Sequence, residues 1–186
     1  TQVRVENWDL TSVKIKYNGQ YKTVSAGEFT VSLYDDVLGW EESQSAFCVD
    51  LSTGISQQTY TIDSLLTPVV ETAWLMDTYA PTSTTTSGAA LQSAIWEMLY
   101  GYSFTLNGPS DVLALYNSYL DALEGATIDT SYLLSNYSVV NILGKQNILV
   151  QTSSSAPVPE PATMILLGAG LLGLAGAGRK KMRKAS

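Results

Sequence analysis

Residues 13–24, VKIKYNGQYKTV, indicate what kind of fold this chain adopts. Val13, Ile15 and Tyr17 alternate with lysines, and this period of two is typical of a β-strand with one buried face. The pair Asn18-Gly19 is a strong signal for a two-residue turn. We therefore expect a β-hairpin in which residues 21–24 return beside the first strand.

Further strand patterns lie on both sides of the chain's middle. Phe29, Val31 and Leu33 repeat the period of two, as a strand with one buried face would. Other strands are expected at residues 46–50, 59–62, 138–143 and 147–151. The last two are separated by Gly144-Lys145-Gln146, so we expect a second hairpin there.

The middle of the chain has helical patterns instead. Helices are expected at residues 67–79, 89–100 and 110–124, because Thr67-Pro68 is a good helix start and a glycine follows each of the other two. Residues 81–88, PTSTTTSG, are expected to form a polar loop. The order of strands, helices and strands predicts an α+β fold, a mainly β domain with a central helical insertion, over residues 1–150.

Charge is strongly segregated along the sequence. Residues 1–155 hold five bases and sixteen acids, a net charge of −11, whereas five bases crowd residues 179–186. An acidic domain of this kind argues against nucleic acid as a partner. The chain has no histidine, which excludes a Ser-His-Asp triad and a histidine metal site. No enzymatic activity, metal or cofactor is predicted.

The end of the chain is expected to contact a membrane. Residues 151–161 form a Ser/Pro linker, and residues 162–178 carry no charge. As a helix this run is about 26 Å long, close to the ~30 Å hydrocarbon core, and the basic residues 179–186 would mark its cytoplasmic side. Ala169, Gly173 and Ala177 form a small-residue stripe that permits close helix packing. A filament or membrane cluster assembled through this transmembrane-type helix is the alternative function, with homo-oligomers as its product.

Three features of this tail occur in a fixed order: the motif Pro159-Glu160-Pro161, the apolar run and the basic end. Together they resemble the PEP-CTERM sorting signal, which an exosortase handles in Gram-negative bacteria that make exopolysaccharide. The resemblance implies an exported protein of the cell envelope or surface, with release into the extracellular matrix as a further option. The sequence shows no leader, so we expect that a signal peptide has been removed before Thr1. Such a signal is an address and not an activity.

Cys48 is the only cysteine, so no internal disulfide can form. From the residues alone it can be buried and inert, paired with another molecule, or committed to another bond. It lies in the segment Phe47-Cys48-Val49-Asp50-Leu51, and further along the chain stands LQSAIWE, residues 91–97. These two segments resemble the Cys-Gln thioester domains of Gram-positive surface adhesins, although Leu91 replaces the threonine commonly found before the glutamine.

In that family the cysteine sulfur replaces the amide nitrogen of the glutamine with loss of ammonia. The resemblance implies that Cys48 is the sulfur donor and Gln92 its acyl partner, for covalent attachment to an amine- or hydroxyl-bearing target. We expect Trp96, one helical turn from Gln92, to shield the bond, and Asp50 or Glu97 to accept a proton. The alternative is an ordinary core stripe of Leu91, Ile95 and Met98 with Gln92 at its edge.

Overall fold

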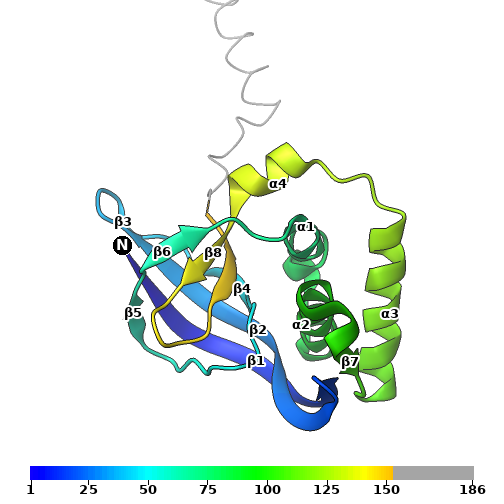
Figure 1. Ribbon diagram of the computed structural model, residues 1–186. Coiled ribbons are helices and arrows are strands. Elements are labelled where there is room, and N and C mark those ends of the chain that lie inside the picture. The colour runs from blue at the N-terminus through cyan, green and yellow to red at the C-terminus, as the bar shows by residue number, and fades with distance from the viewer. Residues whose placement is uncertain (153–186) are drawn as a thin grey trace, which may run out of the picture. The chain divides into compact units, whose positions relative to one another are not determined.

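The hairpin predicted around Asn18-Gly19 is the longest feature of the fold. The computed structural model describes residues 1–152, in which β1 (Gln2–Tyr17) and β2 (Gln20–Asp35) pair antiparallel from Gln2–Tyr34 to Tyr17–Gln20, with one irregularity between Val5 and Asn7 (Figure 1). Asn18 and Gly19 have φ values of 49° and 79°, as a turn with two left-handed residues requires. The strand predicted at residues 29–33 is confirmed, as the continuation of β2.

The strands of the described residues form one nine-stranded sheet with the order β5-β1-β2-β4-β9-β8-β6, to which β3 adds on β2 and β7 on β1. The shorter strands are β3 (Gly39–Trp40), β4 (Gln44–Cys48), β5 (Thr59–Thr61), β6 (Ser64–Leu66), β7 (Phe104–Leu106), β8 (Tyr137–Asn141) and β9 (Ile148–Gln151). Only two residues separate β5 from β6, yet these strands pair with β1 and β8 at opposite ends of the order. The sheet must therefore curl into a half-barrel.

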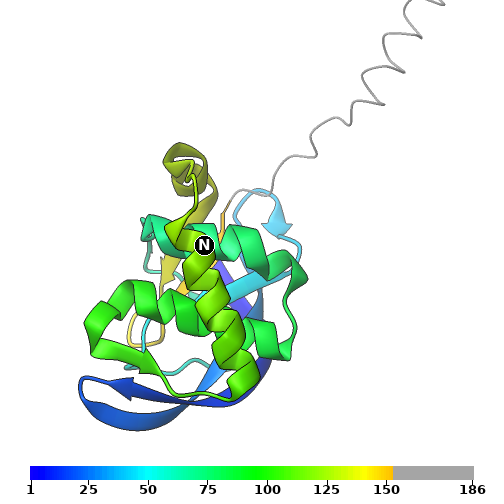
Figure 2. The ribbon, with the colours of Figure 1, turned by 90° about the vertical axis from the view of Figure 1, so that its right-hand side faces the viewer.

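Within residues 1–152, four helices stand beside this sheet (Figures 1 and 2). They are α1 (Val70–Tyr79), α2 (Thr85–Tyr100), α3 (Ser110–Glu124) and α4 (Thr130–Asn136), with single 3-10 turns at Ala80–Thr82 and Gly101–Ser103. Helix α2 packs on β1 and β2 and is flanked by α1 and α3. Strands and helices share one hydrophobic core, so the predicted α+β fold is confirmed.

The structure corrects several element boundaries. Helix α1 begins at Val70, because the backbone at Val69 is still extended. The predicted loop at residues 81–88 is wrong for its second half. Thr84 caps α2, accepting from the Ser87 N–H while the Ser87 hydroxyl accepts from the Thr84 N–H. The run of Ser and Thr was a helix start and not a loop. The strand predicted at residues 46–50 ends at Cys48.

The predicted linker, apolar helix and basic tail lie outside the described residues, apart from Gln151 and Thr152. The same holds for the small-residue stripe of Ala169, Gly173 and Ala177. Within residues 1–152, no helix is both long and apolar enough to cross a membrane. The boundaries assigned to these segments stay predictions.

Candidate functional site at the end of strand β4

Cys48 and Gln92, far apart in the sequence, are joined by two reciprocal hydrogen bonds. The Cys48 N–H donates to Gln92 Oε1 over 2.8 Å, and Gln92 Nε2 donates to the Cys48 carbonyl oxygen over 2.7 Å. Both residues are buried, with exposed fractions of 3% and 1%. The carboxamide of Gln92 is therefore held against the backbone of the chain's only cysteine, out of contact with solvent.

Strand pairing explains why this backbone is open to a side chain. Strand β2 pairs with β4 from Val31–Gln44 to Phe29–Ala46 and no further. On the opposite side of β4, the ladder with β9 continues to Cys48. The backbone groups of Cys48 that face away from β9 are thus left without a strand partner. The Gln92 carboxamide, which has one donor and one acceptor side, pairs with both.

Contacts near its N-terminus hold α2 against the sheet. Thr85 Oγ1 donates to Asp9 Oδ2 over 2.7 Å, and a Cβ at Gly88 would lie 3.5 Å from the Glu28 nitrogen. Gly27, beside this point, has a φ of 153°, and a Cβ there would collide with the Asp9 carbonyl oxygen. These contacts bring α2 close enough for Gln92 to reach the strand end.

Burial governs the acidity of the cysteine. Removal from water raises the pKa of the Cys48 thiol well above its ordinary value, and the negative charge of Asp50 raises it further. The sulfur is therefore held as a thiol and not as a thiolate. A protonated, desolvated thiol is protected from ordinary oxidation and alkylation.

The two carboxylates expected near the pair are engaged elsewhere. Asp50 Oδ1 accepts from the backbone N–H groups of Ser52 and Thr53, and its Oδ2 accepts from the Asn147 N–H over 2.8 Å. Glu97 Oε2 accepts from Tyr116 on α3 over 3.0 Å. Asp50 thus organises the loop after β4, and Glu97 ties α2 to α3.

Trp96 is buried one turn beyond Gln92, with an exposed fraction of 2%. Its ring lies 6.1 Å from that of Phe104 between centroids, and its Nε1 has no hydrogen-bond partner among the described residues. Of the core stripe considered as an alternative, Leu91 and Ile95 are fully buried and Met98 is partly buried against the core. Gln92 is buried beside them. An ordinary core stripe predicts neither the burial of this polar side chain nor its hydrogen bonds with Cys48.

Tyr100, which sequence reasoning did not single out, holds the segment that follows Cys48. Its hydroxyl accepts from the Leu51 N–H over 3.2 Å and donates to the Val49 carbonyl oxygen over 3.4 Å. Gln146 Nε2 donates to the Asp50 carbonyl oxygen over 2.7 Å from the β8–β9 turn. The one available signal was the place of Tyr100 on the helix, two turns beyond Gln92.

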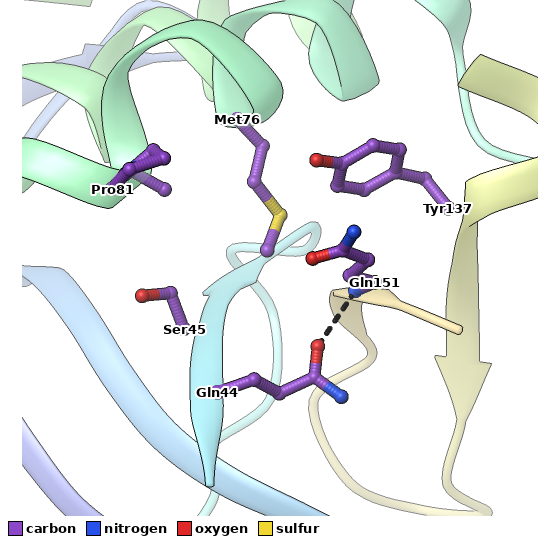
Figure 3. A pocket seen from close by; sticks show the side chains of 7 residues that line it. Gln44, Ser45, Met76, Pro81, Tyr137 and Gln151 are labelled. Atoms are coloured by element: carbon purple, nitrogen blue, oxygen red, sulfur yellow. Dashed lines mark hydrogen bonds between the residues drawn. The ribbon is translucent and has the colours of Figure 1, made fainter. Parts of the chain in front are cut away.

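A separate small cavity of about 100 Å³ lies near the first residues of β4 (Figure 3). Met76 points into it, and Gln44, Pro81, Tyr137 and Gln151 lie around it. The Tyr137 hydroxyl donates to Asp77 Oδ1 over 2.8 Å, and burial, with help from Asp77, raises the pKa of Tyr137. This cavity includes neither Cys48 nor Gln92.

Comparison with known protein families adds one match, to the PEP-CTERM protein-sorting motif, over residues 157–181. The chain ends in a sorting signal. It belongs to an exported protein that is sorted to the cell surface, and the motif implies processing by an exosortase. The prediction made from Pro159-Glu160-Pro161 and its surroundings is confirmed. No curated protein and no solved structure matches the chain.

Proposed function

We propose that this surface protein forms an internal thioester between Cys48 Sγ and Gln92 Cδ and uses it to attach covalently to a target. The observation that carries the proposal is the pair of reciprocal hydrogen bonds between these two residues. The family resemblance of residues 47–51 and 91–97 supports it independently. Surface sorting supplies a setting in which permanent attachment is useful.

Formation of the bond is a balanced acyl transfer. Cys48 Sγ attacks Gln92 Cδ, the C–N bond breaks, and the thiol proton leaves with the amide nitrogen as ammonia. The Cys48 N–H already donates to Gln92 Oε1 over 2.8 Å, which is the oxygen that gains negative charge during the attack. The backbone of the nucleophilic residue thus acts as the donor that stabilises the intermediate.

Attachment to the target is a second acyl transfer, in which the Cys48 sulfur is the leaving group. An amine of the target attacks the thioester carbonyl carbon, the C–S bond breaks, and Cys48 regains its proton as Gln92 becomes a substituted amide. The pKa of Cys48 is raised by burial, so its thiolate is a poor leaving group in the closed site. This slows hydrolysis, and the burial of Cys48 and Gln92 also limits access of water. Neither step needs a cofactor.

The sorting motif supports a second part of the proposal, which concerns the membrane. Its match spans the whole apolar run 162–178, and we assign membrane contact to that run. Residues 1–152, which contain Cys48 and Gln92, then form the part of the protein that lies outside the membrane and carries the thioester.

Amine trapping tests the thioester. We expect the full chain, incubated with methylamine, to add one amine of about 31 Da at Gln92 and to gain one free thiol at Cys48. Peptide mapping locates both changes. Ser93→Ala is the matched control, because Ser93 only donates within its helix, to the Ala89 carbonyl oxygen, and the variant should react like the wild type. An unmodified Gln92, with Cys48 already alkylated on unfolding before any amine is added, contradicts the proposal.

A further inference from the structure

Most bases of the described residues lie around one turn. Three of the five, Lys14, Lys16 and Lys22, flank the β1–β2 turn and are exposed, and residues 10–27 contain no acid. The salt bridges of residues 1–152 involve none of these lysines. We name Lys14, Lys16, Lys22, Tyr17 and Tyr21 the basic hairpin end.

Aromatic rings hold these cations in place. Lys14 Nζ lies 5.1 Å and Lys16 Nζ 5.9 Å from the centroid of the Tyr21 ring, and Lys22 Nζ lies 5.3 Å from that of Tyr17. Tyr21 is 61% exposed. The basic hairpin end therefore presents positive charge together with exposed aromatic surface, on a domain that is otherwise strongly acidic.

The complementary surface lies at the other end of the same two strands. Residues 35–42, DDVLGWEE, which we name the acidic loop, contain four acids and no base. Val37 and Leu38 at its tip are 90% and 84% exposed. Asp35 Oδ1 accepts from the N–H groups of both, each over 2.8 Å, which fixes the loop. The Thr1 ammonium forms an exposed salt bridge with Asp36 over 3.8 Å, but no salt bridge of the described residues involves Glu41 or Glu42.

The two surfaces cannot meet within one molecule. A straight strand of the length of β1 or β2 would span about 50 Å. Although the sheet curls, the pairing of the two strands keeps the turn and the loop at opposite ends of the hairpin. Figures 1 and 2 both show the β1–β2 turn and the β2–β3 loop at opposite ends of the hairpin. The basic hairpin end and the acidic loop can therefore contact each other only when they belong to different molecules.

We propose that the basic hairpin end of one copy binds the acidic loop of a second copy, head to tail. The ammonium groups meet Glu41 and Glu42, and the aromatic rings cover Val37 and Leu38. Because the two surfaces are different and lie at opposite ends of the hairpin, a single head-to-tail contact leaves one surface of each kind free, and further copies can add to them. The contact uses neither Cys48 nor Gln92, so it is independent of the thioester.

Charge reversal tests this contact on the full chain in nonionic detergent. We expect sedimentation velocity to show concentration-dependent assemblies at about 20 mM salt and mostly single molecules at about 300 mM salt. Lys16→Glu should weaken assembly about tenfold or more. Lys145→Glu is the matched control, because it makes the same change in net charge at an exposed turn elsewhere, and it should assemble like the wild type.

Exchanging the charges of the basic hairpin end and the acidic loop is the decisive experiment. Neither Lys14→Glu/Lys16→Glu nor Glu41→Lys/Glu42→Lys should assemble alone, but an equimolar mixture should, because each variant then meets a surface of opposite charge. Three results would overturn the proposal. The wild type could stay monomeric at low salt, its assembly could be weakened neither by added salt nor by Lys16→Glu, or the mixture of the two variants could fail to assemble. Salt-sensitive binding of the monomer to a polyuronate resin, lost in Lys16→Glu, would then assign the basic hairpin end to an acidic polysaccharide.

Discussion

Gln92 makes hydrogen bonds with both backbone groups of Cys48, which lies beyond the point where the pairing of β4 with β2 stops. Leaving such groups buried without partners costs about 1–3 kcal/mol each. A purely structural glutamine would make the same two bonds. What separates the two roles is whether the carboxamide nitrogen stays in the protein, and this makes the chemistry of one side chain the central question.

Two glutamates, Glu97 and Glu6, should contribute to the pH dependence of stability with opposite signs. Burial raises the pKa of Glu97 above its ordinary value of 4.5. Hydrogen bonds from Ser43 and Ser32 lower that of Glu6 below the same value. Folding therefore disfavours the ionised form of Glu97 and favours that of Glu6.

Glu97→Gln should accordingly raise the free energy of unfolding at pH 7, with a gain that shrinks as pH falls through the raised pKa toward 4.5. Glu6→Gln should lower it at pH 7, with a loss that fades as pH falls below 4.5. Urea unfolding between pH 3.5 and pH 7.5, roughly, measures both. The same sign for the two variants would contradict these pKa directions.

At the scale of elements, the proposed bond ties α2 to β4 across 44 residues of sequence. By analogy with a disulfide, closing a loop of that length restricts the unfolded chain by roughly 4 kcal/mol. The link would join the most buried helix to the middle of the sheet. Loss of this link should therefore lower the stability of the whole domain.

A double-mutant cycle measures this tie. Cys48→Ala should lower the melting temperature substantially, although it deletes only one sulfur atom, and Gln92→Ala should lower it somewhat more because two buried hydrogen bonds are also lost. The double variant should be no less stable than Gln92→Ala alone, within about 0.5 kcal/mol. If the two effects simply add, Cys48 and Gln92 are independent core positions.

The elements also show which parts of a fold local patterns predict. The hairpin at Asn18-Gly19 and helix α3 follow from turn and capping signals and were found correctly. Strands β6 and β7 were missed, because three residues are too few for a period and both exist through pairing with β8 and β1. The short helix α4 was missed as well. Tyr100 could not be assigned, since its contacts with Val49 and Leu51 depend on how α2 docks.

At the scale of the whole molecule, the residues before the tail carry a net charge of −11, and most of their bases lie at the basic hairpin end. Like charges over the rest of the surface repel one another, which opposes the compact state. The sorting motif fixes where this acidic domain is displayed. Because Lys14, Lys16 and Lys22 lie at one end of the β1–β2 hairpin, the two ends of that hairpin differ in the sign of their charge.

Screening should relieve this repulsion. We expect the free energy of unfolding of dilute protein at pH 7 to rise as sodium chloride increases from about 20 mM to about 300 mM. Near pH 4, where many carboxylates are protonated, the same change should have less effect. A salt response that is flat at pH 7, or larger at pH 4, would show that repulsion between carboxylates does not limit stability.

The intact mass of the purified full chain tests the central claim most directly. A thioester between Cys48 and Gln92 makes the protein lighter than its sequence by one ammonia, about 17 Da, and leaves no thiol to alkylate. Cys48→Ala and Gln92→Glu should each show the full mass of their own sequence. A wild-type chain at full sequence mass, with Cys48 alkylated quantitatively on unfolding, would contradict the account and leave Gln92 as a hydrogen-bonded cap on the end of β4.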